Sequence, residues 1–299
     1  MLSKPLLRLL ASALLLLSAA TALSAADDYV KSIEKWRAER VAELTTVDSW
    51  LTLIGRHELS HGRHTLGSAA GNDIRLAAGP GRLGVITYAE DGRVTLDLAD
   101  GVGAKIDGTE ARSAELIYQS EKPTYVRFGT ANFYILSRDG KLYVRVRDSE
   151  SPHRKNFAGI DYFPIDPAWR IEAQWVPFNP PHQTNITYTA GQTLPAPVPG
   201  KAVFTHEGHT IELIPIGDNG DLLFFVISDQ TSGIETYGAS RFVYASMPKS
   251  GEKVILDFNQ AHNPPCVFTV FSVCPLPPKE NRMPFPIRAG EKIYRDGPH

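Results

Sequence analysis

The sequence predicts an all-β protein, with antiparallel sheets of the sandwich or barrel type and one amphipathic helix near the N-terminus. From Trp50 onward, apolar residues alternate with polar ones in short runs, and glycine, proline, asparagine and aspartate separate these runs. Such period-two alternation is typical of antiparallel strands that bury one face. Residues 27–44 instead repeat their apolar positions every three to four residues, which predicts a helix. A length of 299 residues suits one large or two medium domains.

Residues 1–26 have the pattern of a secretory signal peptide. Lys4 and Arg8 form a positive start, no charged residue occurs from Leu9 to Ala26, and small residues precede Asp27. The sequence therefore predicts a periplasmic or secreted protein. It also predicts no membrane span after cleavage, because no other apolar run approaches the length that crosses a bilayer. An uncleaved membrane anchor is the alternative, since this apolar stretch is close to spanning length.

Residues 27–47 are expected to contain the helix that precedes the β regions. Tyr29, Ile33, Trp36, Arg40 and Leu44 fall on one face of it, and charged residues lie between them. We expect this face to pack against a sheet through Trp36 rather than to bind a partner helix.

Residues 48–150 are expected to form a β-sandwich, and their first part resembles the forkhead-associated (FHA) fold. The resemblance rests on Gly67-Ser68, on Asn72–Leu76 and on the short strands that follow. FHA domains read phosphothreonine through a Gly-Arg pair, a serine and a loop that carries a histidine. Here Ser68 stands where the arginine is expected, and the loop Ala78–Arg82 has neither serine nor histidine. Phosphate recognition needs charged donors in fixed positions, so phosphopeptide binding is not expected.

Charge and motifs exclude several classes of function. The net charge of −2 becomes −4 without residues 1–26, because 31 basic minus 33 acidic residues becomes 29 minus 33. This mild balance predicts no nucleic-acid partner. The sequence has no phosphate-binding P-loop, no dinucleotide fingerprint and no G-x-S-x-G elbow, and no cofactor is expected. His57, His61 and His64 suit an exposed hairpin better than a set of ligands, so no metal site is predicted.

A polar stretch with a proline, Asp148–Lys155, predicts a domain boundary, after which residues 151–299 form a C-terminal antiparallel β domain. Expected strands are 169–176 and 186–189, followed by a hairpin of 202–205 with 210–215. Thr193–Gly200 contains three prolines and is expected to be a surface connection. Leu222–Ile227 is continuously apolar, which predicts a strand buried on both faces.

Three strands are expected to follow one another as a meander, at 221–228, 234–244 and 253–259. The turn at 229–233 and the end of the third strand then lie at the same edge of the sheet. Polar residues from two separate segments share that rim, which is the pattern of a site built by loops on a rigid scaffold. For each residue alone, capping a turn or pairing with a neighbouring charge is the alternative. The rim residues are Asp229, Thr231, Glu235, Asn259, His262 and Asn263, with Arg241 as a partner for Glu235.

The stretch Asp257–Arg282 is expected to form a proline-stiffened flap beside this rim. It contains both cysteines of the chain, Cys266 and Cys274, together with five prolines. In an oxidising compartment the cysteines are expected to form a disulfide, which stabilises by about 2–3 kcal/mol. A zinc site with His262 is the alternative, although zinc sites usually need four ligands. Two further groups can close over the rim: Glu280, Asn281 and Arg282 with an anion-binding guanidinium, and His153 with Arg154 at the domain boundary.

The last third of the chain resembles a bacterial family catalogued as domain of unknown function 1684. The resemblance rests on the runs SDQTSGIETYGASR, VILDFNQAHNPPCVF and CPLPPKENRMPFPIRAGEKIY, and looser similarity extends back to Trp50. It supports the fold and the location of the site, and implies no activity. It also implies that members without export signals share the cysteine pair, which counts against a disulfide.

Two classes of function suit these observations. The first is a binding module that holds a small polar ligand, a glycan fragment or an envelope partner at the rim formed by 229–235 and 257–282. The alternative is a hydrolase in which His262 acts as general base, Asp257 or Glu235 orients it and Arg282 stabilises the developing anion. A structural envelope protein without a small ligand is the third possibility. The sequence shows no unmistakable nucleophile, so whether the protein is an enzyme stays open.

Overall fold

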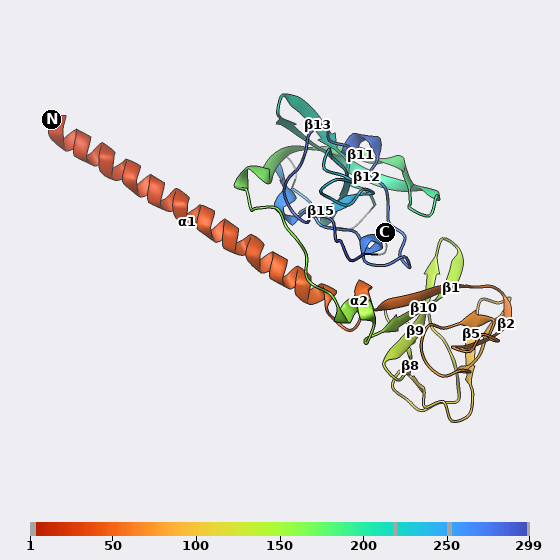
Figure 1. Ribbon diagram of the computed structural model, residues 1–299. Coiled ribbons are helices and arrows are strands. Elements are labelled where there is room, and N and C mark those ends of the chain that lie inside the picture. The colour runs from red at the N-terminus through yellow and green to blue at the C-terminus, as the bar shows by residue number, and fades with distance from the viewer. Residues whose placement is uncertain (1–3, 218–219, 250–252, 298–299) are drawn as a thin grey trace.

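The computed structural model describes residues 4–217, 220–249 and 253–297, with side chains from residue 24 onward. One long helix, α1 (Lys4–Leu44), precedes two β regions, and most strands pair antiparallel (Figure 1). The predicted all-β fold class with its N-terminal helix is therefore confirmed. The N-terminal end of α1 points away from both β regions, whereas its C-terminal end lies beside α2 (Pro152–Lys155), where the two regions meet (Figure 1).

Helix α1 is longer than the helix expected from periodicity and runs through the predicted signal peptide. Cleavage after Ala26 stays a prediction, and N-terminal sequencing of the secreted protein tests it. Within the part of the chain whose side chains are described, no helix is both long and apolar enough to cross a membrane. The face predicted to pack does so: Ile33 and Leu44 are fully buried, and Arg40 is 9% exposed.

The first β region is a sandwich of two five-stranded sheets, in the orders β1-β10-β9-β8-β6 and β3-β2-β4-β5-β7. Its core is apolar and includes the fully buried Leu66, Ile86 and Phe133. The strands are β1 (Leu53–Leu59), β2 (Gly62–Gly67), β3 (Ile74–Arg75), β4 (Gly84–Tyr88), β5 (Val94–Leu98), β6 (Lys105–Ile106), β7 (Ser113–Glu115), β8 (Val126–Phe128), β9 (Ala131–Arg138) and β10 (Lys141–Asp148). A hairpin with Asp139-Gly140 at its turn joins β9 to β10, and both residues adopt positive φ there.

The second β region combines a four-stranded sheet, in the order β13-β12-β11-β16, with the hairpin β14-β15. A second core lies between them and includes the fully buried Phe225, Leu256 and Phe258. The strands are β11 (Arg170–Thr187), β12 (Thr193–His206), β13 (His209–Leu213), β14 (Leu222–Ile227), β15 (Arg241–Ser246) and β16 (Lys253–Asp257). Short 3₁₀ turns lie between the main elements: η1 (Trp50–Thr52), η2 (Pro167–Trp169), η3 (Phe258–Gln260), η4 (Pro265–Val267) and η5 (Lys279–Asn281).

The prediction that Thr193–Gly200 is a surface connection was wrong, because these residues form the first half of β12 and pair with β11. The three prolines fall at alternate positions, so their missing N–H groups all face one side of the strand. No strand needs N–H donors from that side, because β13 pairs only with residues 202–206 of β12, and Gly217 N donates to the Pro197 carbonyl there. A proline-rich segment can therefore be half of a long hairpin when only its other edge must donate hydrogen bonds to a strand.

The expected meander also needs correction. The second strand begins at Arg241 rather than at residue 234, and the third strand, β16, pairs with β11 instead of with β15. Residues 229–240 form a compact series of turns in which Thr231 O accepts the backbone N–H groups of Glu235 and Thr236. The segments 229–235 and 257–282 that were expected to share a rim are still neighbours, because Ser228, directly before the first, pairs with Arg282 at the end of the second.

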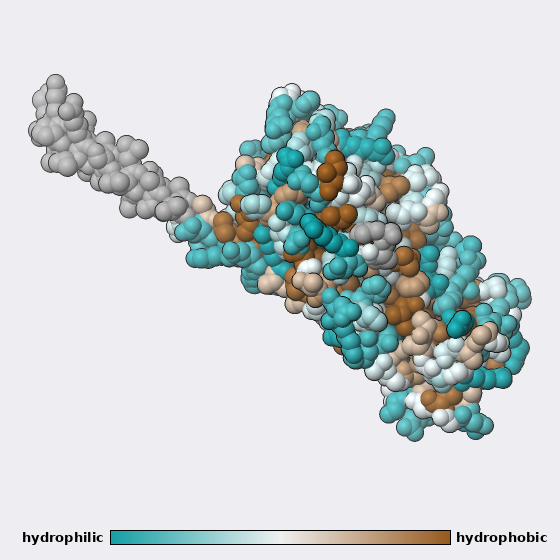
Figure 2. All heavy atoms as spheres, viewed as in Figure 1, coloured by the Kyte–Doolittle hydropathy of each residue, from teal (hydrophilic) through white to brown (hydrophobic). Residues whose placement is uncertain are grey.

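A third, smaller apolar cluster joins the two β regions. Leu44 at the end of α1 and Leu51 in η1 pack there against Val267, Phe268 and Tyr294. Figure 2 shows hydrophobic residues interrupting the mostly hydrophilic surface where α1 meets the body and along the boundary between the two regions.

Candidate functional site

Three residues of the predicted rim, Asp229, Thr231 and Arg241, form a buried cluster of hydrogen bonds. Asp229 Oδ2 accepts a hydrogen bond from Arg241 Nη2 at 2.8 Å, and both side chains are almost completely buried. Asp229 Oδ1 accepts from the Thr231 hydroxyl at 2.6 Å and from the backbone N–H groups of Thr231 and Ile287. Arg241 also donates to the carbonyls of Ala289 and Ile287. These residues fasten the C-terminal segment to the sheet, and water or ligand does not reach them.

Asp257 and Asn259 anchor helix α1. The Tyr29 hydroxyl donates to the Asp257 carboxylate, with distances of 2.9 and 3.0 Å to its two oxygens. Asn259 Nδ2 donates to Tyr29 Oη at 2.9 Å and to Asp166 O at 2.8 Å. Burial raises the pKa of Asp257, although the bonds from Tyr29 and Asn259 oppose this. Both side chains therefore hold the part of α1 around Tyr29 against the C-terminal region.

The acid–histidine pair required for the expected hydrolase is not assembled. His262 Nδ1 lies 3.0 Å from Gln260 O, and among the hydrogen bonds of the described residues none joins His262 to Asp257 or Glu235. Glu235 instead pairs with Arg288 at 2.9 Å on the surface, not with Arg241 as expected. The turns at 229–240 direct Glu235 toward the C-terminal segment and away from the loop that carries His262.

The two groups expected to close over the rim lie elsewhere. Asn281 is fully buried, donates to Ile214 O and Val226 O, and so ties η5 to the strands. Arg282 donates to Pro277 O, and Glu280 lies next to Lys279, so neither forms an anion site with His262. Arg154 donates to Thr45 O at 2.8 Å and to Ser149 O at 2.9 Å, and His153 is exposed beside it in α2. This pair supports the joint between the β regions.

Cys266 and Cys274 are free, which corrects the expected disulfide. The loop is fixed without it, because Cys274 N donates to Thr189 Oγ1 and Thr189 N donates to Cys274 O. A hydrogen bond between the two thiols, aided by one from Tyr237, lowers the pKa of Cys266, and that bond and burial raise the pKa of Cys274. Among the described residues no group of three or more His, Cys, Asp or Glu side chains is arranged to hold a metal ion.

The structure instead places His262 and Asn263 in the wall of a cavity of about 410 Å³ between α1, η1 and β15, here called the aromatic cleft. Its apolar walls are the rings of Trp36, Trp50, Phe242 and Tyr244. Its polar groups are Arg40, Glu43, His262 and Asn263. A cavity in which aromatic walls and a few polar groups converge is a common form of a small-ligand site.

Arg40 is held at the back of the aromatic cleft by a buried carboxylate. Its Nε donates to Glu291 Oε1 at 3.1 Å, and its Nη2 donates to Asn263 O at 3.1 Å. The other Glu291 oxygen accepts from Asn263 N at 2.7 Å. Burial of Glu291, which has no exposed surface, raises its pKa, while Arg40 opposes that shift. The pair thus fixes both the helix and the loop that carries Asn263.

His262 presents an unprotonated nitrogen to the aromatic cleft. Because Gln260 O can only accept, Nδ1 carries the proton and Nε2 is the acceptor. Burial and the nearby positive Arg40 lower the pKa of His262 to about 3, so the ring is neutral at physiological pH. Its ring stacks on Tyr244, with centroids 5.7 Å apart and planes at 17°. Among the described residues Nε2 has no hydrogen-bond partner.

A second acceptor in the wall also has no partner. Asn263 is fully buried; its Nδ2 donates to Lys292 O at 2.7 Å, but its Oδ1 accepts no hydrogen bond. An orphan buried acceptor costs about 1–3 kcal/mol and calls for an explanation. Because this oxygen has no exposed surface, a ligand in the aromatic cleft does not reach it, and the structure supplies no partner for it.

Sequence reasoning missed the helical half of this site. Trp36 was expected only to pack, and Arg40, Glu43 and Trp50 were not considered as site residues. One signal was present: an arginine at position 40 on an otherwise apolar helix face requires a buried partner.

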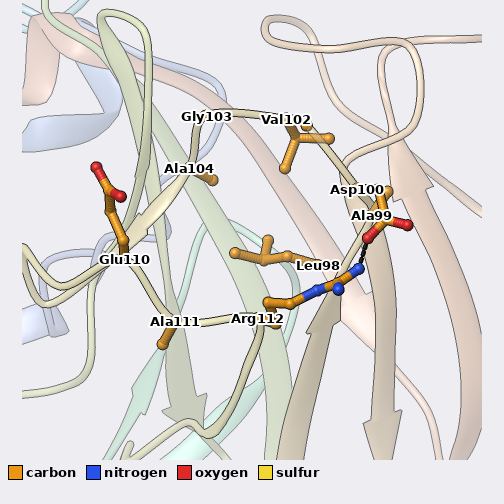
Figure 3. Close-up of a pocket in the computed structure, with 10 residues that line it drawn as sticks. Leu98, Ala99, Asp100, Val102, Gly103, Ala104, Glu110, Ala111 and Arg112 are labelled. Atoms are coloured by element: carbon orange, nitrogen blue, oxygen red, sulfur yellow. Dashed lines mark ion pairs between the residues drawn. The ribbon is translucent and has the colours of Figure 1, made fainter.

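Another cavity, of about 520 Å³, lies in the sandwich (Figure 3). Its walls are mainly loop backbone and small side chains such as Ala99, Val102 and Ala111. Its charged residues Asp100 and Arg112 pair with each other at the surface (Figure 3). Neither an aromatic ring nor an unsatisfied buried polar atom lines it, so it is a weaker candidate than the aromatic cleft.

Residues 155–292 match the model of a family described as "Protein of unknown function (DUF1684)". A similar solved structure is the solution NMR structure of an uncharacterised protein from gene locus rrnAC0354 of Haloarcula marismortui, which is 30% identical. That match covers 46% of this chain and 78% of the other, with a TM-score of 0.39. No curated protein matches the chain. Since the family match begins at residue 155, the FHA resemblance of residues 48–150 stays a prediction.

Proposed function

We propose a function from the aromatic cleft, because residues 155–292 match the DUF1684 family model and the description of that family gives no activity. The protein is a binding module for a small, neutral ligand that carries hydroxyl groups on an apolar ring, such as a sugar. The observation that carries this proposal is an unpartnered acceptor, His262 Nε2, on a ring that lines a cavity with aromatic walls.

A sugar matches these groups in two ways. The C–H face of its ring packs on aromatic side chains such as Trp36 and Trp50, and one of its hydroxyls donates to His262 Nε2. Hydroxyls also accept hydrogen bonds, which lets them use any free N–H of Arg40. The charges disfavour ionic ligands at this position, because Arg40 repels cations and the exposed Glu43, 3.5 Å from Arg40 Nη1, repels anions.

The experiment is a titration of the purified protein with two neutral disaccharides, cellobiose and N,N′-diacetylchitobiose, followed by isothermal calorimetry and by the shift in melting temperature. A ligand that binds only the folded state raises the melting temperature. His262→Phe keeps a stacking ring and removes Nε2. We expect this substitution to weaken binding about five- to tenfold, the effect of one hydrogen bond.

The matched control is His61→Phe in the sandwich. His61 also stacks on a tyrosine, Tyr88, with ring centroids 3.9 Å apart, but it lies outside the aromatic cleft. It should leave the affinity unchanged. If neither disaccharide binds, or if the His262→Phe protein binds as tightly as the wild type, the proposal is wrong.

A further inference from the structure

A second cavity adjoins the aromatic cleft. It has a volume of about 590 Å³ and is here called the polar chamber; its side chains include Tyr29, Ser32, Arg170, Tyr244, Lys253 and Asp257. Tyr244 lines both cavities and is 41% exposed. Its ring therefore separates them without closing the passage from one to the other.

Helix α1 forms one wall of both cavities. Residues of α1 that line the polar chamber and the aromatic cleft follow one another at three- to four-residue spacing: Tyr29, Ser32, Trp36, Arg40 and Glu43. The opposite wall is continuous too, because Gln260 lines the polar chamber and His262 lines the cleft. At 1.5 Å of rise per residue, the stripe from Tyr29 to Glu43 is about 21 Å long. The two cavities therefore form one groove that is long enough for several linked sugar rings.

The polar chamber contains a positive charge that is not part of a hydrogen bond or an ion pair. Among the described residues the guanidinium of Arg170 has no hydrogen-bond or ion-pair partner, and it lies 6.0 Å from the centre of the Tyr29 ring. Lys253 pairs with the exposed Glu172 at 2.9 Å. The one carboxylate in the chamber wall, that of Asp257, accepts a hydrogen bond from the Tyr29 hydroxyl, and the nearby charge of Arg170 opposes the rise of its pKa. An anionic group placed beside Arg170 gains a bidentate partner.

We propose that this groove binds an acidic oligosaccharide, with neutral rings in the aromatic cleft and a carboxylate in the polar chamber beside Arg170. This inference rests on the proposed function and adds the length and the charge of the ligand. The order of the two cavities sets the direction: the acidic end lies toward Tyr29 and the neutral end toward Glu43.

The test compares a trisaccharide of one terminal glucuronate and two neutral glucose rings (glucuronosyl-cellobiose) with its methyl ester, which has the same length and no charge. We expect the acid to bind about tenfold more tightly than the ester, as for one charge-assisted hydrogen-bonded contact. The preference should decrease as salt is raised, because Arg170 is exposed. Arg170→Gln should abolish the preference by weakening only the acid. Arg82→Gln, at an exposed arginine of the sandwich, should change neither affinity, and equal melting temperatures show that all the variants fold.

Tyr244→Ala should weaken both forms, since its ring contacts both cavities. Equal binding of acid and ester, or an unchanged preference in the Arg170→Gln protein, shows that the inference of an acidic ligand in the groove is wrong. The proposed function is still supported in that case if the disaccharides bind in a His262-dependent way. If no saccharide binds at all, the proposed function fails and this inference fails with it.

Discussion

At the scale of single residues, the environment of His262 determines what the aromatic cleft can recognise. A histidine with an ordinary pKa alternates between donor and acceptor near neutrality. Here the Gln260 carbonyl fixes the tautomer, and burial with Arg40 nearby removes the charged form. The ring is therefore a permanent acceptor at Nε2 over the physiological range of pH.

This environment makes stability depend on pH. The folded-state pKa of His262, about 3, lies below the ordinary value of 6.5, so the unfolded chain binds a proton that the native state does not. This proton binding lowers the free energy of unfolding. The loss is absent above pH 6.5 and grows as the pH falls toward 3. We expect wild-type protein to lose stability faster than the His262→Phe variant in this window, by at most about 1.4 kcal/mol per pH unit.

Urea unfolding of both proteins, at several pH values in that window, measures the difference. Asp257 and Glu291 have raised pKa values and act with the opposite sign, but both proteins contain them, so they cancel in the comparison. Parallel curves of unfolding free energy against pH would show that His262 titrates normally in the folded state.

At the scale of elements, the docking of α1 depends on a buried ion pair. Arg40 and Glu291 are 9% and 0% exposed, and Glu291 also accepts from the loop at Asn263. Arg40→Met leaves that carboxylate buried without its cation, which typically costs about 3–5 kcal/mol. Lys35→Met on the same helix breaks only the exposed Lys35–Glu39 pair and should cost less than about 0.5 kcal/mol.

Denaturant unfolding of the two variants measures this contrast. The double variant Arg40→Met/Glu291→Gln should recover part of the loss, because it removes the unpaired charge. Equal midpoints for Arg40→Met and Lys35→Met would mean that α1 is not held by this pair.

The elements also show what local patterns can predict. The packed face of α1 was predictable because Ile33 and Leu44 recur at helical spacing, and the hairpin at Asp139-Gly140 was predictable because its turn residues favour positive φ. Pairing partners were not predictable in the same way. Nothing near Lys253 indicates that β16 pairs with β11, since that choice depends on how the two cores close.

The candidate site was also predictable only in its local part. The loop after Asp257 was identified from its polar residues, and His262 and Asn263 do line a cavity. Its opposite wall comes from α1, more than two hundred residues earlier in the sequence. Periodicity reveals that a helix face is buried but does not reveal what it is buried against.

At the scale of the whole molecule, the two β regions have separate hydrophobic cores. Leu66 and Phe133 belong to the sandwich core, and Phe225 and Leu256 belong to the C-terminal core. The apolar cluster that joins them is smaller, with five buried residues around the end of α1. Regions linked through a small contact can unfold in separate steps, so independent domains at 48–150 and 151–299 stay a prediction with a direct test.

Tryptophan positions make that test possible. The sandwich strands, residues 53–148, contain no tryptophan, whereas Trp169 and Trp175 pack in the C-terminal core. Trp50, whose ring centre lies 5.0 Å from the Arg145 guanidinium of β10, is replaced by phenylalanine in every protein of this test. Phe133→Ala removes a fully buried ring from the sandwich and should cost that region about 3–5 kcal/mol. If the cores are independent, far-UV circular dichroism gains a transition at lower temperature while the tryptophan fluorescence transition stays in place.

The control Phe225→Ala, at an equally buried phenylalanine of the C-terminal core, should move the fluorescence transition instead. A single transition that moves equally in both signals for either variant would make the two sheets one cooperative unit, joined through α1 and the cluster around Leu51.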